Sequence, residues 1–381
     1  MRVLILHNQL WTQYKSVVFQ GIYDEFKKTG DELLVLQTSI CEKSRLNILD
    51  FNAANFKYTY PYILLNNTSL EDSNPIRTAF LWIYYAIKFR PNVINLTGYS
   101  ELGTIFILIY SKLFNVKTLM TNESIHSERL HNPTISKKII RSFKKLLIQL
   151  TDGFLSYGIK SNDYLFRFRR SKRSILSFLN SFDRSKFLSE NTEFVNEKTP
   201  YILFVGRLSE EKNLFCLIEL ARIFVLDRLN YRIKIIGEGD EYDSLNSLIN
   251  KESLPIDLEG AKNWDQLSII YKSASAFILP SLNETWGMVA NEALEMGVPV
   301  ICSSACGCAD DLVINDINGL VLKNFNFIDN LNSETYKRLK AYLLMNSASS
   351  KTSNSLNKNI ASIYDETKLI DEFIFAFRKI A

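Results

Sequence analysis

The sequence has little cysteine, glycine and proline: 5 Cys, 14 Gly and 8 Pro in 381 residues. So few cysteines, without regular spacing, exclude a small secreted module held by disulfides. The low glycine and proline content excludes a collagen-like fibre and a low-complexity chain. Hydrophobic residues make up 46% of the chain and charged residues 23%, which is typical of a globular protein with a large core. At this length we expect two domains.

Long apolar runs and targeting signals are also missing. The longest apolar stretch, Leu102–Phe114, contains Ser111 and Lys112 and is too short to cross a bilayer. The chain starts with a strand-like run, Val3–Leu6, and lacks the small-residue cleavage site of a secretory signal. We therefore expect a cytoplasmic protein without a membrane-spanning segment.

Several catalytic and metal-binding motifs are absent. The chain has no Asp-x-Asp pair, the usual holder of a divalent metal at a diphosphate, and no Gly-x-Ser-x-Gly elbow for a serine nucleophile. Cys302, Cys306 and Cys308 lie close together, but no fourth ligand follows at a spacing typical of zinc sites. We expect no metal and no cofactor, and interpret these cysteines as ordinary buried or loop cysteines.

Charge is distributed unevenly between the two halves. Residues 1–195 have 26 Lys and Arg against 16 Asp and Glu, whereas residues 196–381 have 19 against 25. In the basic half, Lys137–Leu150 combines one apolar face with five cations, and Arg167–Arg173 forms a second basic cluster. Such a helix either docks on an anionic membrane or covers a sheet with its lysines in water. No stacking-aromatic motif accompanies the charge, so we do not expect nucleic acid as a partner.

Short apolar runs alternate with amphipathic segments in both halves, and the pattern restarts after residue 200. The expected strands are Arg2–His7, Glu32–Gln37, Val93–Leu96, Lys117–Thr121, Gly153–Tyr157, Tyr201–Val205, Arg232–Ile236, Ile256–Leu258, Ala276–Leu279 and Val298–Cys302. This alternation predicts βαβ units and parallel sheets. We expect an α/β fold with two tandem Rossmann-like domains, residues 1–190 and 199–363, and a C-terminal helix over 364–381 that packs on the first domain. Ligands of such sheets bind beyond the carboxyl ends of the strands, so an interdomain cleft is the expected site.

Three motifs follow strands of the second half. Gly206-Arg207, with Lys212 five residues later, precedes a helix. Two cations at a helix N-terminus suit a diphosphate, although an ordinary strand–turn–helix junction has the same pattern.

The second motif, Gly237-x-Gly239, also ends a strand. It permits close backbone approach to a ligand, or only a tight turn, and it lacks the third glycine of the dinucleotide fingerprint.

The third motif contains two carboxylates. Glu284 lies in a polar loop, Gly287 opens a helix, and Glu292 follows Glu284 by eight residues, or about two helical turns. Carboxylates placed there accept hydrogen bonds from sugar hydroxyls, while the amides at the helix start face a phosphate.

Together, these motifs resemble a known family. Glu284 and Glu292 match the E-x7-E motif of GT-B glycosyltransferases, and their surroundings resemble the retaining family 4, the glycosyl transferases group 1. The Gly206, Gly237 and Pro280 motifs and the segment from Gly307 to Gly319 occur in that family's order. The resemblance covers nearly all of residues 200–325, and it implies the GT-B fold.

The resemblance also implies roles for individual residues. Arg207 and Lys212 would bind the donor diphosphate, Glu284 the donor sugar, and Glu292 the ribose. The residues implied to surround the donor with their backbone are Gly237, Gly239, Trp286, Gly287 and Met288.

A histidine of the first domain is a further catalytic candidate. His126 follows an expected strand at about the point where family members place a histidine near the donor sugar. A loop histidine without a role is the alternative, and Glu123 in the same loop is a candidate for the acceptor.

The resemblance implies retaining, metal-independent transfer of a hexose from a nucleoside-diphosphate sugar, with UDP favoured over GDP. The expected acceptor is a glycan or a lipid-linked sugar in the assembly of cell-surface polysaccharide, with the protein peripheral on the inner face of the membrane. A sugar-nucleotide epimerase of the same fold and an inactive sugar-nucleotide-binding module are the alternatives.

Overall fold

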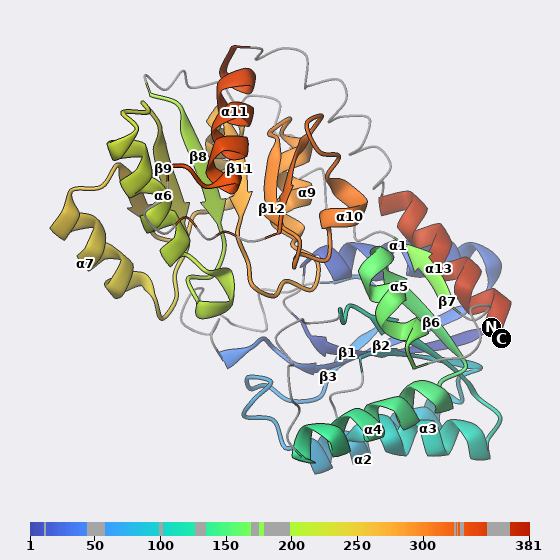
Figure 1. Cartoon of the computed structure of the whole chain (residues 1–381). Helices are drawn as coiled ribbons and strands as arrows, with labels where there is room; N and C mark the ends of the chain where they lie inside the picture. The colour runs from blue at the N-terminus through green and yellow to red at the C-terminus, as the bar shows by residue number, and fades with distance from the viewer. Residues whose placement is uncertain are drawn as a thin grey trace. The chain divides into compact units, whose positions relative to one another are not determined.

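The computed structural model describes residues 1–10, 13–43, 58–98, 102–125, 135–168, 175–178, 199–323, 325, 327, 331–348 and 366–381. The chain forms two compact units. The first is Met1–Asn180 with Glu366–Ala381, and the second is Ser181–Asp365. Each contains its own parallel sheet (Figure 1). The expected domain border, between residues 190 and 199, falls in 179–198, outside the described residues.

The first unit contains a seven-stranded sheet in the order β3-β2-β1-β4-β5-β6-β7, with every pair parallel. Its strands are β1 (Arg2–Gln9), β2 (Glu32–Ser39), β3 (Tyr62–Leu64), β4 (Val93–Thr97), β5 (Lys117–Asn122), β6 (Gly153–Tyr157) and β7 (Ile175–Phe178). Long buried runs in the inner strands form the core, because a parallel sheet is covered on both faces. All five strands expected in this half are present.

Helices cover both faces of this sheet. They are α1 (Gln13–Thr29), α2 (Pro75–Phe89), α3 (Gly103–Leu113), α4 (Ile135–Leu150), α5 (Gly158–Phe166) and α13 (Glu366–Ile380). In Figure 1, α1 and α13 lie on one side of the sheet and α2, α3 and α4 on the other. Asn74 caps α2 by accepting hydrogen bonds from two amides of its first turn, and Pro75 occupies the first helical position, where no amide hydrogen is needed.

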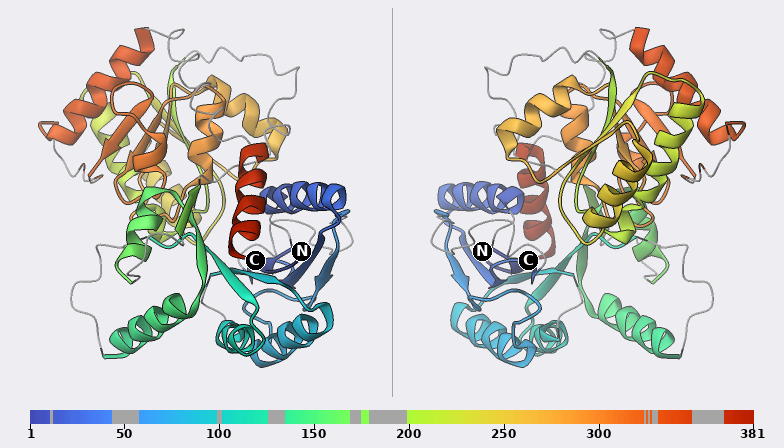
Figure 2. Two further views of the ribbon diagram at one scale, coloured as in Figure 1. Left: turned by 90° about the vertical axis from the view of Figure 1, so that its right-hand side faces the viewer. Right: turned by 90° about the vertical axis from the view of Figure 1, so that its left-hand side faces the viewer.

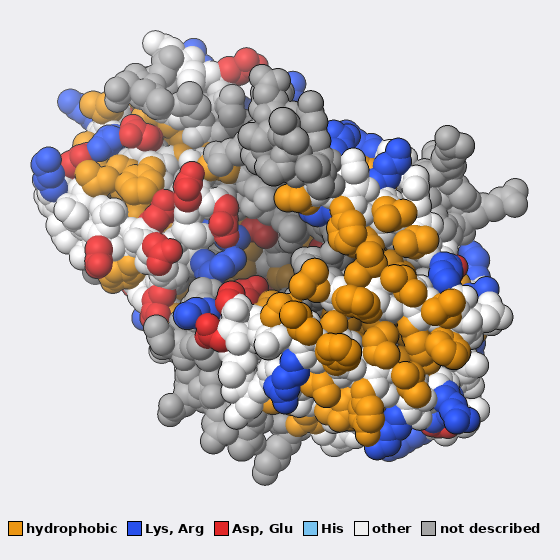
Figure 3. All heavy atoms as spheres, turned by 90° about the horizontal axis from the view of Figure 1, so that it is seen from below, with side chains coloured by type: hydrophobic (Ala, Val, Ile, Leu, Met, Phe, Trp, Pro, Cys, Tyr) orange, Lys and Arg blue, Asp and Glu red, His pale blue; other side chains and the backbone are white. Residues whose placement is uncertain are grey.

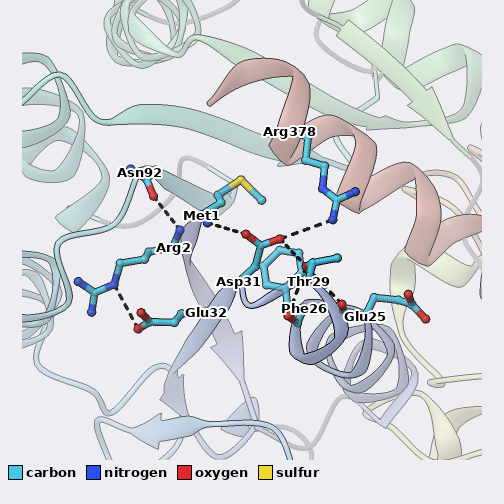
Figure 4. Close-up of polar contacts among 9 residues, drawn as sticks. All are labelled: Met1, Arg2, Glu25, Phe26, Thr29, Asp31, Glu32, Asn92 and Arg378. Carbon is cyan, nitrogen blue, oxygen red and sulfur yellow. Dashed lines mark hydrogen bonds and ion pairs between the residues drawn. The ribbon is translucent and has the colours of Figure 1, made fainter.

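Helix α13 crosses α1 on the first unit (Figure 2). A Cβ at Gly21 of α1 would lie 2.1 Å from Cδ1 of Ile370, so the missing side chain allows the two helices to pack closely. At the end of α1, Asp31 accepts a hydrogen bond of 2.5 Å from the amino group of Met1 and lies 3.5 Å from a guanidinium nitrogen of Arg378 (Figure 4). The C-terminal helix is therefore tied to the start of the first sheet.

The second unit contains a six-stranded parallel sheet in the order β10-β9-β8-β11-β12-β13. Its strands are β8 (Tyr201–Val205), β9 (Arg232–Ile236), β10 (Ile256–Glu259), β11 (Ala276–Leu279), β12 (Val300–Ser303) and β13 (Gly319–Leu322). Its helical segments are the 3-10 turn η4 (Glu210–Lys212) and the helices α6 (Phe215–Leu226), α7 (Tyr242–Glu252), α8 (Trp264–Ser273), α9 (Met288–Glu295), α10 (Ala309–Leu312) and α11 (Glu334–Ala348).

In both sheets the strand order reverses beside the first strand of the unit. β1 lies between β2 and β4, and β8 lies between β9 and β11. Ligands of open parallel sheets bind at such a switch point, beyond the carboxyl ends of the strands. The loops after β1, β8 and β11 lie at these switch points and are therefore candidate parts of a binding site. Among the described residues, no helix has both the length and the apolarity that crossing a membrane requires.

Candidate functional site

The loops after β8 and β11 are joined directly at the switch point of the second unit. The amide of Leu282 donates to the carbonyl of Glu211 at 2.8 Å, and the side-chain amide of Asn213 donates to the carbonyl of Pro280 at 3.3 Å. The ammonium of Lys212 donates to Oε2 of Glu284, and each of the two side chains is only 14% exposed. Two residues predicted for different parts of the donor thus form one partly buried ion pair.

Arg207 lies on the same loop as Lys212 but is more exposed. Its guanidinium is 3.2 Å from a carboxylate oxygen of Glu211. Nearby, the pKa of Glu241 is raised, first by burial and then by the neighbouring carboxylates of Glu210, Asp240 and Glu211. This concentration of negative charge was not predicted from the sequence. An anion that binds here depends on Arg207 and Lys212 to offset it.

The glycines after β9 are required by the protein itself. Gly237 and Gly239 have φ of 150° and 154°, and a Cβ on them would lie 1.9 Å from the carbonyl oxygen of Gly206 and 2.3 Å from that of Leu208. The amide of Leu208 also donates to the carbonyl of Glu238 at 2.9 Å. The two glycines therefore allow the loop after β9 to approach the loop after β8 closely. Their contact with a donor stays a prediction.

We expect Gly237→Ala to destabilise the second unit by at least ~1–3 kcal/mol, because the new methyl group collides with backbone at a strained φ. Chemical denaturation followed by circular dichroism measures the loss. Gly260→Ala is the matched control, since its Cβ would meet only a side-chain oxygen of Glu238 at 3.5 Å. Equal stability of the two variants would contradict this reading of the loop.

Helix α9 begins at the same edge of the sheet. Gly287 is its N-cap with φ of 97°, and no side chain of the described residues caps the helix. The indole of Trp286 is buried and donates to Oδ1 of Asn291 at 2.8 Å, so it is part of the core. The indole of Trp286 is therefore not available to a ligand, while the uncapped start of α9 favours an anion.

Glu292 lies in the second turn of α9, and its side chain is buried. Its Oε2 accepts a hydrogen bond of 2.9 Å from the hydroxyl of Tyr271 on α8. Burial raises the pKa of Glu292 to about 7. The structure therefore places Glu284 and Glu292 with different partners, Lys212 and Tyr271. Sequence reasoning missed Tyr271, although the need of a buried carboxylate for a donor could have prompted a search.

The cysteines near β12 support the Glu284 loop. Cys302, Cys306 and Cys308 are buried thiols, which confirms that part of the prediction. The amide of Gly307 donates to the carbonyl of Glu284 at 2.8 Å, and a Cβ on Gly307 would lie 1.9 Å from the carbonyl of Thr285. Small residues thus let the loop after β12 pack directly under the site. No group of three or more His, Cys, Asp or Glu in the described part of the chain is arranged to hold a metal ion.

A second polar cluster lies at the carboxyl edge of the first sheet. Lys15, in the first turn of α1, is buried; it donates to the hydroxyl of Tyr157 and lies 3.2 Å from a carboxylate oxygen of Glu123. The side chain of Glu123 remains 42% exposed. His7, at the end of β1, is buried 2.9 Å from Oε1 of Gln37, and burial lowers its pKa to about 4. His126 lies outside the described residues.

Lys15 was not predicted from the sequence. A lysine in a helix is normally solvated, and only the fold brings it under the end of β6. Glu123, in contrast, was a candidate because it lies in the loop that follows an expected strand, together with His126.

Residues 186–360 match the family model described as glycosyl transferases group 1. An uncharacterized glycosyltransferase of Methanocaldococcus jannaschii is 36% identical over 33% of this chain and 32% of its own length. A Campylobacter jejuni α-1,4-N-acetyl-D-galactosaminyltransferase, named for a diNAcBac-PP-undecaprenol-linked substrate, is 22% identical over 76% of this chain and 79% of its own length. With the first curated relatives, the matched region spans between a fifth and a third of their length.

Solved structures match along the whole chain. HepE of Anabaena, in complex with UDP, has a TM-score of 0.70 at 13% identity and covers 100% of both chains. Sucrose-phosphate synthase of Thermosynechococcus elongatus has a TM-score of 0.72 at 15% identity, with 100% of this chain and 98% of the other covered. Identities this low show the fold alone.

The fold is therefore GT-B, as the sequence predicted. Within this fold, residues 186–360 are the part that matches the glycosyl transferases group 1 model. The expected cleft between the two domains stays a prediction.

Proposed function

We propose that the protein transfers a hexose from a nucleoside-diphosphate sugar to a hydroxyl group of an acceptor, with retention of configuration and without a metal ion. The observation that carries this proposal is the partly buried pair of Lys212 and Glu284 beside the uncapped start of α9. One cation, one carboxylate and free helix amides at a switch point are the groups that a sugar diphosphate needs.

The reaction makes a negative charge on the leaving diphosphate. Lys212 and Arg207 stabilise that charge, together with the amides at the start of α9, because fixed donors in a partly desolvated site act more strongly than water does. Glu284, held by Lys212, accepts a hydrogen bond from a donor-sugar hydroxyl through its remaining lone pairs. Glu292 binds the ribose in the same way.

The acceptor binds at the carboxyl edge of the first sheet in this proposal. Glu123 offers a half-exposed carboxylate whose other side is fixed by the buried Lys15. Its free oxygen lone pairs accept a hydrogen bond from an acceptor hydroxyl.

UDP is the proposed nucleotide of the donor, and a lipid-linked glycan is the proposed acceptor. The proposed process is the assembly of cell-surface polysaccharide at the inner face of the membrane. HepE, similar in fold, was solved with UDP and with UDP-glucose. The Campylobacter relative is named for an undecaprenol-linked substrate, and an Acholeplasma laidlawii relative is named α-monoglucosyldiacylglycerol synthase. Because another relative is named as GDP-mannose-dependent, GDP is the competing nucleotide.

Calorimetric titration with UDP and GDP tests the donor site. We expect UDP to bind and Arg207→Ala and Glu292→Ala each to weaken binding by about 10- to 100-fold, since the first removes a charged hydrogen-bond donor and the second a hydrogen-bond acceptor. Arg338→Ala is the matched control, because Arg338 forms an ion pair with Asp316 at 3.5 Å elsewhere in the second unit.

Other outcomes separate the alternatives. Well-folded protein that binds neither nucleotide would overturn the proposal. Binding without turnover against a broad acceptor panel would identify a binding module. Interconversion of the donor sugar without any acceptor would identify an epimerase.

A further inference from the structure

Helix α2 is apolar on two opposite sides. Its inner side buries Trp82 and Ala86 against the core of the first unit. Its outer side exposes Ile76, Phe80, Tyr84 and Ile87, with exposed fractions between 54% and 73%. A surface helix normally presents polar residues on its outer side. Folding of this unit therefore does not explain the exposed apolar residues on the outer side of α2.

Helices α3 and α4 extend the same surface. On α3, Phe106, Ile109 and Leu113 recur on the outer side with exposed fractions between 49% and 75%, while Ile107 and Leu108 are buried. α3 packs against both α2 and α4. Figure 3 shows the result as one broad, continuous apolar surface. We call it the apolar face: the exposed apolar side chains of α2, α3 and α4.

The three helices of the apolar face carry charge of one sign only, and Asp152, which pairs with Lys112 at 2.5 Å, lies outside them. The sequences of the three helices contain no Asp and no Glu. Their cations are Arg77, Lys88, Lys112, Lys137, Lys138, Arg141, Lys144 and Lys145. Lys and Arg side chains are visible at the border of the apolar face in Figure 3. A large apolar patch with a cationic border fits a partner that is apolar inside and anionic at its surface.

We propose that the apolar face of α2, α3 and α4 is inserted into the interface of an anionic lipid bilayer, with the aromatic and aliphatic side chains at the acyl boundary and the cations on the headgroups. This rests on the proposed peripheral location but extends it from the charges of α4 to an insertion surface on α2 and α3. It is independent of the donor chemistry in the second unit.

A second copy of the chain fits this surface less well. A two-fold interface places the same patch on both subunits, so the cations of one copy would meet the cations of the other with no carboxylate of these helices between them. An anionic lipid surface offers the opposite charge over the same area, and each cation near it adds attraction.

The test is flotation of the full chain with phosphatidylcholine vesicles that contain phosphatidylglycerol, at low salt. We expect wild type to float, and Phe80→Glu/Phe106→Glu to reduce the partition coefficient at least about tenfold, because two charges enter the acyl boundary. Leu226→Glu/Ile317→Glu is the matched control, with two similarly exposed apolar residues replaced on the second unit. Lys144→Glu/Lys145→Glu should lower binding to these vesicles, with little binding of any form to pure phosphatidylcholine.

UDP titration on the same variants separates this proposal from the proposed function. The Phe80→Glu/Phe106→Glu variant should bind UDP as wild type does, so loss of vesicle binding leaves the donor site intact. Wild type that fails to float at low salt, or a Phe80→Glu/Phe106→Glu variant that floats as well as wild type, would overturn the insertion proposal. A wild-type dimer that the same variant dissociates, without vesicle binding, would identify the apolar face as a contact between copies.

Discussion

Replacing Lys212 by methionine is expected to lower kcat/KM for sugar transfer by about 30- to 1,000-fold, which corresponds to ~2–4 kcal/mol of transition-state stabilisation. The ammonium is mostly buried beside Glu284 and the start of α9, where a fixed charge acts strongly on the leaving diphosphate. Steady-state rates with the donor identified by calorimetry measure the effect. Lys262→Met is the matched control, since Lys262 pairs with Glu259 at 2.9 Å in the same unit.

Loss of stability is the competing explanation for a slow Lys212 variant. Removing the ammonium leaves the carboxylate of Glu284 largely buried without its partner, at a cost of ~1–3 kcal/mol to folding. The exchange Lys212→Glu/Glu284→Lys restores opposite charges at the two positions. We expect the exchanged pair to recover most of the stability and little of the rate, because the cation then extends from the wrong loop.

The exchange therefore distinguishes the two roles of the pair. A variant in which rate and stability recover together would show that Lys212 and Glu284 only hold the loops after β8 and β11 together. A Lys212→Met variant with the wild-type rate would remove Lys212 from the mechanism altogether.

The strands that sequence predicted best are the inner ones. Strands such as β8 and β11 are buried over their whole length, and a continuous apolar run between turn residues identifies them. The strands that sequence missed are β3, β7 and β13, which are short and lie at sheet edges. An edge strand has a neighbour on one side only, so three or four residues suffice and no recognisable pattern remains.

The residues of the candidate site could be predicted from the sequence, but the contacts between them could not. The positions of Lys212, Glu284 and Glu292 follow from motif spacing. Their contacts join Lys212 to Glu284 and Glu292 to Tyr271, across 72 and 21 positions of chain. Such contacts depend on how loops from separate strands meet at one edge of the sheet, which local patterns do not encode.

The apolar face shows a second limit of periodicity. α4 has one clear apolar side and was considered for membrane docking from its sequence. α2 has apolar residues on both sides, so its pattern resembles that of a buried helix. Only the fold shows which stripe meets the core and which remains exposed.

The stability of the protein is expected to depend on pH through Glu292. Its pKa is about 7 in the folded protein and near 4.5 in an exposed chain, because burial disfavours the ionised form. Above pH 4.5 the unfolded chain releases this proton while the folded protein retains it. The contribution of Glu292 to stability therefore falls as the pH rises from about 4.5 to 7, by about 3 kcal/mol in total, and then levels off.

Glu292→Gln removes this titration while keeping an oxygen that accepts the Tyr271 hydroxyl. We expect the variant to gain stability relative to wild type between pH 5 and 8, measured by chemical denaturation at several pH values. Glu334→Gln, at an exposed position of α11, is the control and should follow wild type. Parallel curves for wild type and Glu292→Gln would show that Glu292 does not retain its proton.

Donor binding is expected to change the protonation of Glu292. Ribose hydroxyls donate hydrogen bonds to a carboxylate, so bound UDP favours the ionised form of Glu292 and lowers its pKa. Binding at pH 6–7 then releases a proton, and UDP affinity rises with pH across this range in wild type but not in Glu292→Gln. Titrations in two buffers of different ionisation enthalpy measure the proton directly. Proton release that persists in Glu292→Gln would assign it to another group, and its absence from wild type would remove Glu292 from the ribose site.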